Sequence, residues 1–148
     1  TVYYTSPVRD ATNERFRVYP RVWRDEADTP KAELARRIRA DRVDVLVDLN
    51  GHTTFHSTET LFLRAAPVQA HFIGWAGTSG FAGVDWRLVD SLTDPPGAEP
   101  CFSERLLRLD PCFLAYQPPE DVLATPDTRD DAPRPVTFCS FNALPKFT

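Results

Sequence analysis

The sequence has no methionine and contains only six glycines and three cysteines in 148 residues. The cysteines are odd in number and show no close CxxC spacing, which argues against a disulfide framework and a zinc site. We expect reduced thiols, mostly packed inside a cytoplasmic protein; they are Cys101, Cys112 and Cys139. Because there is no initiator methionine and residue 1 falls inside a predicted strand, we also expect a piece of a longer protein.

An excess of basic charge and long hydrophobic runs are missing too. The formal net charge is −4, so the sequence offers no broad electrostatic reason to bind nucleic acid or an anionic membrane. Val43–Leu49 is interrupted by two aspartates, and no apolar run reaches the length of a membrane-spanning helix. No signal-peptide pattern opens the chain. We therefore expect neither nucleic acid nor a membrane among the partners.

The hydrophobic pattern that is present indicates an α/β protein. Hydrophobic residues make up 42% and charged residues 26% of the chain, close to the globular average. The expected strands are Val2–Thr5, Arg15–Trp23, Val43–Leu49, Val68–Trp75, Asp85–Asp90, Glu104–Leu109 and Val136–Phe141. A short extended piece is expected at Pro111–Tyr116, and helices are expected from Thr29–Pro30 onward and at Thr58–Ala65.

The first of these helices has a start signal and an apolar face. Thr29 is expected as the N-cap, with Pro30 in the first turn. Leu34 and Ile38 lie one turn apart on one face. Val43–Leu49 follows, and its nearly continuous apolar content favours a buried strand of a parallel sheet. The order helix, strand, helix, strand, loop, strand is typical of a doubly wound, Rossmann-like α/β sheet.

Ligands of open α/β sheets bind beyond the carboxyl ends of the strands. Three loops are expected there, namely Asn50–Thr53, Gly74–Gly80 and Asn142–Lys146. In the second loop, glycines let the backbone approach a ligand, and two hydroxyl side chains suit a sugar or a phosphate; the alternative is a tight strand connection. In the third, Lys146 at a helix start suits a pyrophosphate, although spacing alone favours an ordinary surface lysine.

The histidines and aspartates favour structural roles over a metal or catalytic site. His52 and His56 are four residues apart, but a third ligand and a carboxylate are missing from the pattern. His52 remains a plausible polar group at the carboxyl end of a strand, and His71 is expected to be a packed or hydrogen-bonded residue within one. Asp44 and Asp48 share a strand face, and a capping or loop-fixing role is favoured over a catalytic carboxylate pair.

Several motifs occur in the order of one known family. They are Ile38–Thr53, Arg64–Gly80, Asp85–Asp90, Asp94–Gly97, Ser103–Leu109 and Phe138–Lys146. From about residue 30 to the end, the chain resembles glycosyltransferase family 41, the O-linked N-acetylglucosamine transferases and their bacterial and plant SPINDLY-like relatives. Trp75 and Ala76 depart from the family's Tyr-Pro, as do Ala143 and Pro145 from its last motif.

The resemblance implies a GT-B fold, in which two Rossmann-like lobes enclose the active site. Residues 1–116 would form part of the N-terminal catalytic lobe, residues 117–134 the interlobe linker, and residues 135–148 the start of the C-terminal lobe. Tetratricopeptide (TPR) repeats are expected upstream in the full protein. We expect the fragment alone to be inactive, because half of the cleft is missing.

The reaction implied is inverting transfer of a sugar from a nucleotide sugar to Ser/Thr hydroxyls of acceptor proteins, without a metal or other cofactor. Lys146 matches the family lysine that contacts the donor's diphosphate and stabilises the leaving nucleotide. The implied donor-binding residues are Ile73, Gly74, Gly77, Thr78, Ser79, Gly80 and Asn142. Further residues of the cleft would be Asn50, Gly51, His52 and Thr53. UDP-GlcNAc is the expected donor; the alternatives are protein O-fucosylation from GDP-fucose and an inactive scaffold.

Overall fold

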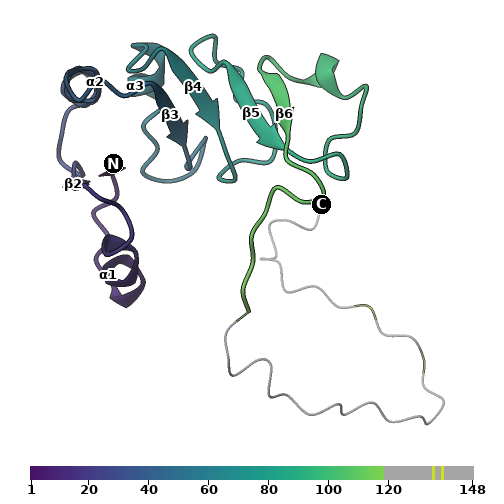
Figure 1. The fold of residues 1–148 in the computed structure, drawn as a ribbon, viewed down its shortest axis with the longest axis horizontal. Helices are drawn as coiled ribbons and strands as arrows, with labels where there is room; N and C mark the ends of the chain where they lie inside the picture. The colour runs from purple at the N-terminus through teal and green to yellow at the C-terminus, as the bar shows by residue number, and fades with distance from the viewer. Residues whose placement is uncertain (119–134, 136–137, 139–148) are drawn as a thin grey trace. The chain divides into compact units, whose positions relative to one another are not determined.

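The computed structural model describes residues 1–118, 135 and 138. The chain divides into two compact units, Thr1–Ala115 and Tyr116–Thr148. All helices and strands of the described residues lie in the first unit (Figure 1). The predicted linker and the predicted start of the second lobe fall almost wholly outside the described residues and stay predictions, as does the last predicted strand.

The strands form two sheets in which every pair is parallel. The smaller sheet joins β1 (Val2–Tyr4) to β2 (Trp23–Asp25). The larger sheet has the order β3–β4–β5–β6, formed by Val45–Asp48, Val68–His71, Trp86–Val89 and Arg105–Arg108 (Figure 1). The predicted α/β architecture with a parallel sheet is confirmed, although each strand is shorter than its pattern predicts.

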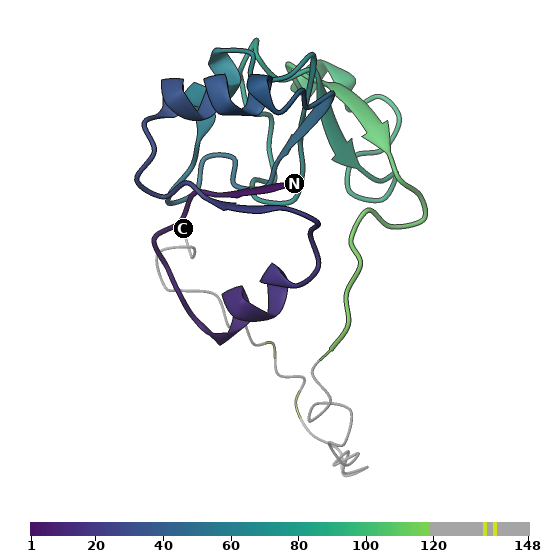
Figure 2. The same cartoon turned by 60° about the vertical axis from the view of Figure 1, so that its left-hand side comes forward.

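The hydrophobic core cluster of the described residues is centred on α2. The helical segments are α1 (Ala11–Arg17), α2 (Lys31–Ala40), α3 (Thr58–Phe62) and the 3-10 turn η1 (Glu99–Cys101). Leu34 and Ile38 are buried, as the spacing predicts, and they cluster with Ala35 and Ala65. Tyr3 of β1 and Leu46 of β3 pack against this cluster. Strands of both sheets therefore rest on α2, and Figure 2 shows β1 and β2 passing below it.

The strand predicted at Arg15–Trp23 is wrong. Asp10 starts a helix here, because its carboxylate accepts a hydrogen bond from the Asn13 N–H at 2.7 Å, which is the bond of a helix N-cap. The helix continues through Arg17, and only Trp23 of the predicted strand belongs to β2. Phe16 is 59% exposed, so the alternation of arginines and apolar residues does not mark a buried strand face.

The predicted cap of α2 is also wrong, although the helix itself is confirmed. The Thr29 hydroxyl donates to the Glu26 carboxylate at 2.5 Å, and no side chain caps the helix at Pro30. Glu26 is 2% exposed and also receives Nη1 of Arg37 at 2.8 Å. A buried carboxylate needs hydrogen-bond donors, so the Thr29 hydroxyl binds Glu26 and does not cap the helix.

Two elements end earlier than the pattern predicts because single residues take the left-handed conformation. β4 stops at His71, since Ile73 has φ of 65° and the Gly74 N–H donates to the Phe72 carbonyl at 2.8 Å. α3 stops before Arg64, which has φ of 50°. Neither residue is a glycine, so the sequence gives little warning of these turns.

The two faces of the larger sheet differ in composition and burial. Its helix-covered face carries Leu46, Asp48, Gln69, His71, Arg87, Val89, Leu106 and Arg108. Its open face carries Val45, Val47, Val68, Ala70, Trp86, Leu88, Arg105 and Leu107. Val45 and Val47 are 55% and 41% exposed, so the prediction that this strand is buried on both faces is wrong.

Three smaller expectations have mixed outcomes. Cys101 and Cys112 are exposed, so the prediction of packed thiols is wrong for these two, and Cys139 lies outside the described residues. Pro111–Tyr116 forms no strand. No helix of the described residues is long and apolar enough to cross a membrane.

Candidate functional site

The loop that follows β3 is folded around the Asp48 carboxylate. Its two oxygens accept the N–H groups of Gly51 at 2.8 Å and Asn50 at 3.4 Å. Gly51 has φ of 57°, and a Cβ placed on it would lie 2.5 Å from Nε2 of His71. Only glycine fits this position, and Asp48 has the loop-fixing role that the sequence favours.

The loop that follows β4 lies directly against the first loop. A Cβ placed on Gly74 would overlap the backbone carbonyl oxygen of Leu49, so the absence of a side chain allows the two loops to touch. Ile73 and Trp75, on either side of Gly74, are 52% and 42% exposed. The close approach therefore leaves two large side chains at the surface, at the carboxyl ends of β3 and β4.

His52 joins the two loops. Its Nε2 lies 2.9 Å from the carbonyl oxygen of Ser79, and its ring lies 5.2 Å from the Trp75 ring and 4.9 Å from the Phe81 ring, centroid to centroid. A carbonyl oxygen only accepts, so Nε2 carries a hydrogen in this contact. The structure thus brings together two of the three predicted loops.

The hydroxyl groups of the second loop bind a residue that the sequence did not single out. Glu104, which directly precedes β6, accepts the Ser79 N–H at 2.6 Å, the Ser79 hydroxyl, and the Thr78 hydroxyl at 2.7 Å. Glu104 belongs to the Ser103–Leu109 motif and opens the predicted strand Glu104–Leu109, but no role in the site was predicted for it. The carboxylate comes from a segment 25 residues away along the chain, so local pattern gave no signal of this contact.

A buried polar row lies beneath the two loops. His71 and Arg87 are partners in the register of β4 and β5 and are 1% and 4% exposed. Nη2 of Arg87 donates to the Trp75 carbonyl at 2.6 Å. Nε2 of His71 lies 3.7 Å from the Asp48 carboxylate. The prediction of His71 as a packed strand residue is confirmed, and Arg87 is a second support of the loop that the sequence analysis missed.

The His71 ring is kept neutral by its surroundings. Burial lowers the pKa of His71 below its ordinary value. The Asp48 carboxylate acts in the opposite direction, while the Arg87 cation lowers the pKa further. Neither ring nitrogen has a hydrogen-bond partner.

Among the described residues, no three His, Cys, Asp or Glu side chains are grouped so as to hold a metal ion.

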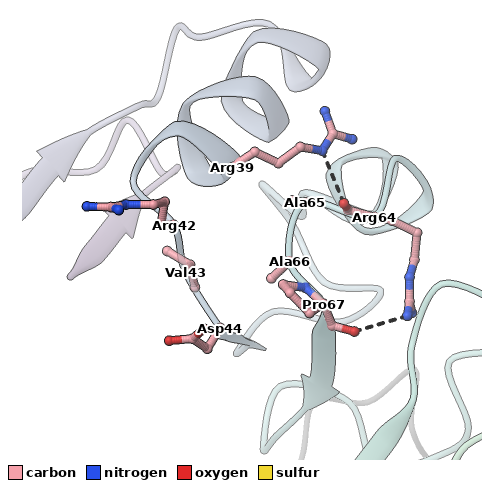
Figure 3. A pocket seen from close by; sticks show the side chains of 8 residues that line it. All are labelled: Arg39, Arg42, Val43, Asp44, Arg64, Ala65, Ala66 and Pro67. Atoms are coloured by element: carbon pink, nitrogen blue, oxygen red, sulfur yellow. Dashed lines mark hydrogen bonds between the residues drawn. The ribbon is translucent and has the colours of Figure 1, made fainter.

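The first unit also contains cavities. One, of about 470 Å³, lies at the amino ends of β3 and β4 (Figure 3). Nε of Arg39 donates to the Arg64 carbonyl, and Nη2 of Arg64 donates to the Pro67 carbonyl, each at 3.2 Å. Figure 3 shows the Arg42 side chain extending away from the cavity. Arg64 also pairs with the Asp85 carboxylate at 2.9 Å. The basic groups here are therefore bound within the protein or point outward, and the cavity lies at the opposite strand ends from the two loops.

The second cavity, of about 580 Å³, lies between β1 and β3. Valines and leucines make up much of its wall, and its lining includes Asn50 of the first loop. The contact of His52 with Ser79, in contrast, joins two of the loops that the sequence predicts for ligand binding. We therefore take the two joined loops, Asn50–Thr53 and Gly74–Gly80, as the candidate site.

Comparison with known proteins assigns the chain to a family. The profile of Glycosyl transferase family 41 matches residues 28–116. The chain belongs to glycosyltransferase family 41. The family 41 region covers α2, the whole larger sheet and both loops of the candidate site. The predicted family is therefore confirmed.

The relatives of this family 41 chain include plant SPINDLY proteins. It is 39% identical over 158 aligned positions to the probable UDP-N-acetylglucosamine–peptide N-acetylglucosaminyltransferase SPINDLY of Arabidopsis thaliana, which covers 99% of the chain and 17% of the relative. The SPINDLY protein of Solanum lycopersicum is 38% identical, covering 99% of the chain and 16% of the relative. The chain thus spans about a sixth of these proteins.

A solved structure supports the same assignment. The K341M mutant of the Thermobaculum terrenum O-GlcNAc transferase has a TM-score of 0.76 and 35% identity to this chain. The match covers 80% of this chain and 23% of that one. The predicted fold class, a partial Rossmann-like lobe of a GT-B glycosyltransferase, is confirmed by this likeness together with the parallel sheets.

The predicted site residues of this family 41 chain divide into two groups. Lys146 and Asn142 lie outside the described residues. The others lie in the two loops, except Ile73, which directly precedes the second loop. Several of their polar groups are bound within the protein: the Asn50 amide donates to the Phe55 carbonyl at 3.3 Å and the Thr53 hydroxyl to the Asn50 carbonyl at 2.8 Å. Their contact with a donor stays a prediction.

Proposed function

We propose that the full protein transfers a sugar from a nucleotide sugar to Ser or Thr hydroxyls of acceptor proteins, with UDP-GlcNAc as donor. The observation that carries the proposal is the contact of His52 with Ser79, which joins the two loops at the carboxyl ends of β3 and β4 in a chain of glycosyltransferase family 41. The names of the SPINDLY relatives supply the donor.

Each part of the site has a role in this reaction. Ile73 and Gly74 line the donor sugar through the exposed edge of their loop. Nδ1 of His52 is an acceptor for a hydroxyl hydrogen, from the donor sugar or from the acceptor protein, because Nε2 is committed to Ser79. Lys146 neutralises the negative charge that grows on the diphosphate as the nucleotide leaves. No metal or other cofactor takes part in the proposal.

GDP-fucose is the second candidate donor. The chain is 39% identical to the SPINDLY protein of Arabidopsis thaliana but 30% identical, over 61% of its length, to the SEC protein of the same plant. The resemblance to SPINDLY-like proteins is the reason for considering fucose transfer.

We further propose a cytoplasmic protein with TPR repeats upstream of the catalytic region.

The test uses the full-length protein with two donors and two lysine variants. Wild type and Lys146→Ala are incubated with UDP-GlcNAc or GDP-fucose and a Ser/Thr-rich acceptor, and the acceptor is weighed by mass spectrometry. Wild type should add one sugar, and Lys146→Ala should be about a hundredfold slower, as when a single charge-stabilising group is lost. Lys31→Ala is the matched control, since Lys31 and Lys146 are the only lysines of the chain and Lys31 starts α2.

The mass of the adduct decides between the donors. A hexosamine adduct supports UDP-GlcNAc, and a deoxyhexose adduct replaces it with GDP-fucose. Absence of any adduct and of nucleotide release with either donor would contradict the transferase proposal and favour an inactive scaffold.

A further inference from the structure

Glu104 is a buried carboxylate with an unusual set of partners. It is 5% exposed, and carboxylates are rarely this buried unless they are paired. Its hydrogen-bond partners are Thr78 and Ser79 of the neighbouring loop, and no basic side chain of the described residues forms an ion pair with it. All three donors come from two consecutive residues.

These contacts use every hydrogen that the two hydroxyl groups possess. A serine or threonine hydroxyl has one hydrogen and two lone pairs. The Thr78 and Ser79 hydroxyls both donate to Glu104. Neither hydroxyl has a hydrogen left for a sugar or phosphate while Glu104 is ionised.

Three of the four lone pairs of the two hydroxyls are occupied as well. Oγ1 of Thr78 accepts the Ser103 N–H at 3.0 Å and the Gly80 N–H at 3.2 Å. Oγ of Ser79 accepts the Phe81 N–H at 3.2 Å. The two hydroxyls therefore form an internal network that shapes the loop, with Glu104 as its centre.

Glu104 is ionised under ordinary conditions. Burial by itself raises the pKa of Glu104, but the hydrogen bonds from the Ser79 and Thr78 hydroxyls and from the Ser79 N–H outweigh burial and hold the pKa below its ordinary value. The same network continues to His52, since the Ser79 carbonyl accepts Nε2 of that ring. One carboxylate thus binds two residues of the loop, and one of them, Ser79, also contacts His52.

We propose that Glu104 is a positioning residue of the donor site, which holds Gly74–Gly80 so that the donor sugar meets the loop backbone and not the hydroxyls of Thr78 and Ser79. The inference rests on the proposed function and deepens it. Thr78 and Ser79 are retained for the contact with Glu104, and the donor is bound by the surface that this contact shapes.

The first test replaces Glu104 by its amide in the full-length protein. Glu104→Gln keeps the size of the side chain but presents one N–H₂ group to donors that need an acceptor. We expect the KM for UDP-GlcNAc to rise about tenfold or more, the scale of a lost charge-assisted hydrogen bond, with the KM for the acceptor protein unchanged. Glu99→Gln is the control, because Glu99 precedes the same strand, is exposed and binds Arg108 instead of the loop.

A double variant separates positioning from direct contact. If Ser79 acts only through Glu104, then Glu104→Gln with Ser79→Ala has the same donor KM as Glu104→Gln alone. If the Ser79 hydroxyl binds the donor directly, the two losses multiply. A folded Glu104→Gln protein with a donor KM within about twofold of wild type, or multiplying losses, would overturn the proposal.

A readout that needs no turnover keeps this inference separate from the proposed function. Backbone amide exchange of the peptides covering 74–80 is compared in wild type and Glu104→Gln by mass spectrometry. Faster exchange in the variant, but not in Glu99→Gln, supports positioning; equal exchange contradicts it. A wild type that transfers no sugar from either donor refutes the proposed function alone, because the exchange result still decides whether Glu104 holds the loop.

Discussion

The two faces of the larger sheet differ in the polarity of the side chains that they bury. On the helix-covered face, Gln69, His71 and Arg87 are 0%, 1% and 4% exposed. On the open face, Val47 and Leu107 are 41% and 44% exposed. Burial of a polar side chain costs free energy of folding unless the side chain is hydrogen-bonded. The buried polar row of this sheet lies directly beneath the two loops.

The difference indicates that the helix-covered face is shaped by the site above it. Arg87 has no ion-pair partner within the described residues, and its Nε and Nη1 have no hydrogen-bond partner. Such a cation does not favour folding. Its one hydrogen bond holds the Trp75 carbonyl, so its role is in the loop.

The largest expected effect comes from a side chain that would force the two touching loops apart. In Gly74→Ala, the new Cβ would overlap the Leu49 carbonyl, a backbone atom that cannot rotate away. We expect the free energy of unfolding to fall by about 3 kcal/mol, measured by urea denaturation. Gly77→Ala is the control: its Cβ would lie 3.3 Å from the end of the Trp75 side chain, and the expected loss is below about 1 kcal/mol. Equal losses would show that the loops do not touch.

The second effect concerns His71 and acid. The pKa of His71 is lowered in the folded protein from its ordinary 6.5, so the unfolded chain binds a proton that the folded one does not. Stability from this residue is present above about pH 6.5 and is lost as the pH falls below it. The melting temperature should therefore decline between about pH 7 and 5, and His71→Met should flatten that decline. An unchanged slope would contradict a lowered pKa of His71 in the folded protein. The carboxylates of Asp48 and Glu104 would then offset the effects of burial, Arg87 and His52 on this pKa.

The third effect separates stability from function on the same face. Arg87→Met removes an unpaired buried charge, so the free energy of unfolding should change by less than about 1 kcal/mol or increase. The loss of the Trp75 contact should lower sugar transfer by the full-length protein about tenfold. A variant that loses stability but keeps its transfer rate would contradict a role of the polar row in the site.

The smallest effect belongs to the open face. Val47→Thr places a hydroxyl on a half-exposed strand position and should change the free energy of unfolding of the 148-residue chain by less than about 0.5 kcal/mol. The same measurement on Gly74→Ala gives the scale for comparison. A loss above about 2 kcal/mol at Val47 would show that the open face is packed like the covered one.

Much of this fold is predictable from local pattern. The spacing of Leu34 and Ile38 predicts α2, and four apolar runs predict β3 to β6. Such patterns are visible in the sequence because the residues that form one buried helix face or one strand lie close together along the chain. The Asp10 cap was missed because the alternation of arginines with apolar residues in Arg15–Trp23 resembled a strand. The turn at Ile73 was missed because a left-handed φ is rare in a β-branched residue.

The site is predictable only as far as its loops. The carboxyl ends of parallel strands meet at one edge, so Asn50–Thr53 and Gly74–Gly80 could be expected together. The partners of Thr78 and Ser79 could not, since Glu104 reaches them through the register of β5 with β6. The pairing of His71 with Arg87 likewise depends on the register of β4 with β5, which the sequence does not state.

The most direct test of the account asks whether a donor contacts the two joined loops. Amide exchange of the full-length protein is measured by mass spectrometry with and without UDP-GlcNAc, and peptides covering 50–53 and 74–80 are followed together. The account predicts slower exchange in both loops when the donor is bound, and no change at the amino ends of β3 and β4 around Arg39 and Arg64. Protection at that opposite end, or donor binding without protection of either loop, would contradict it.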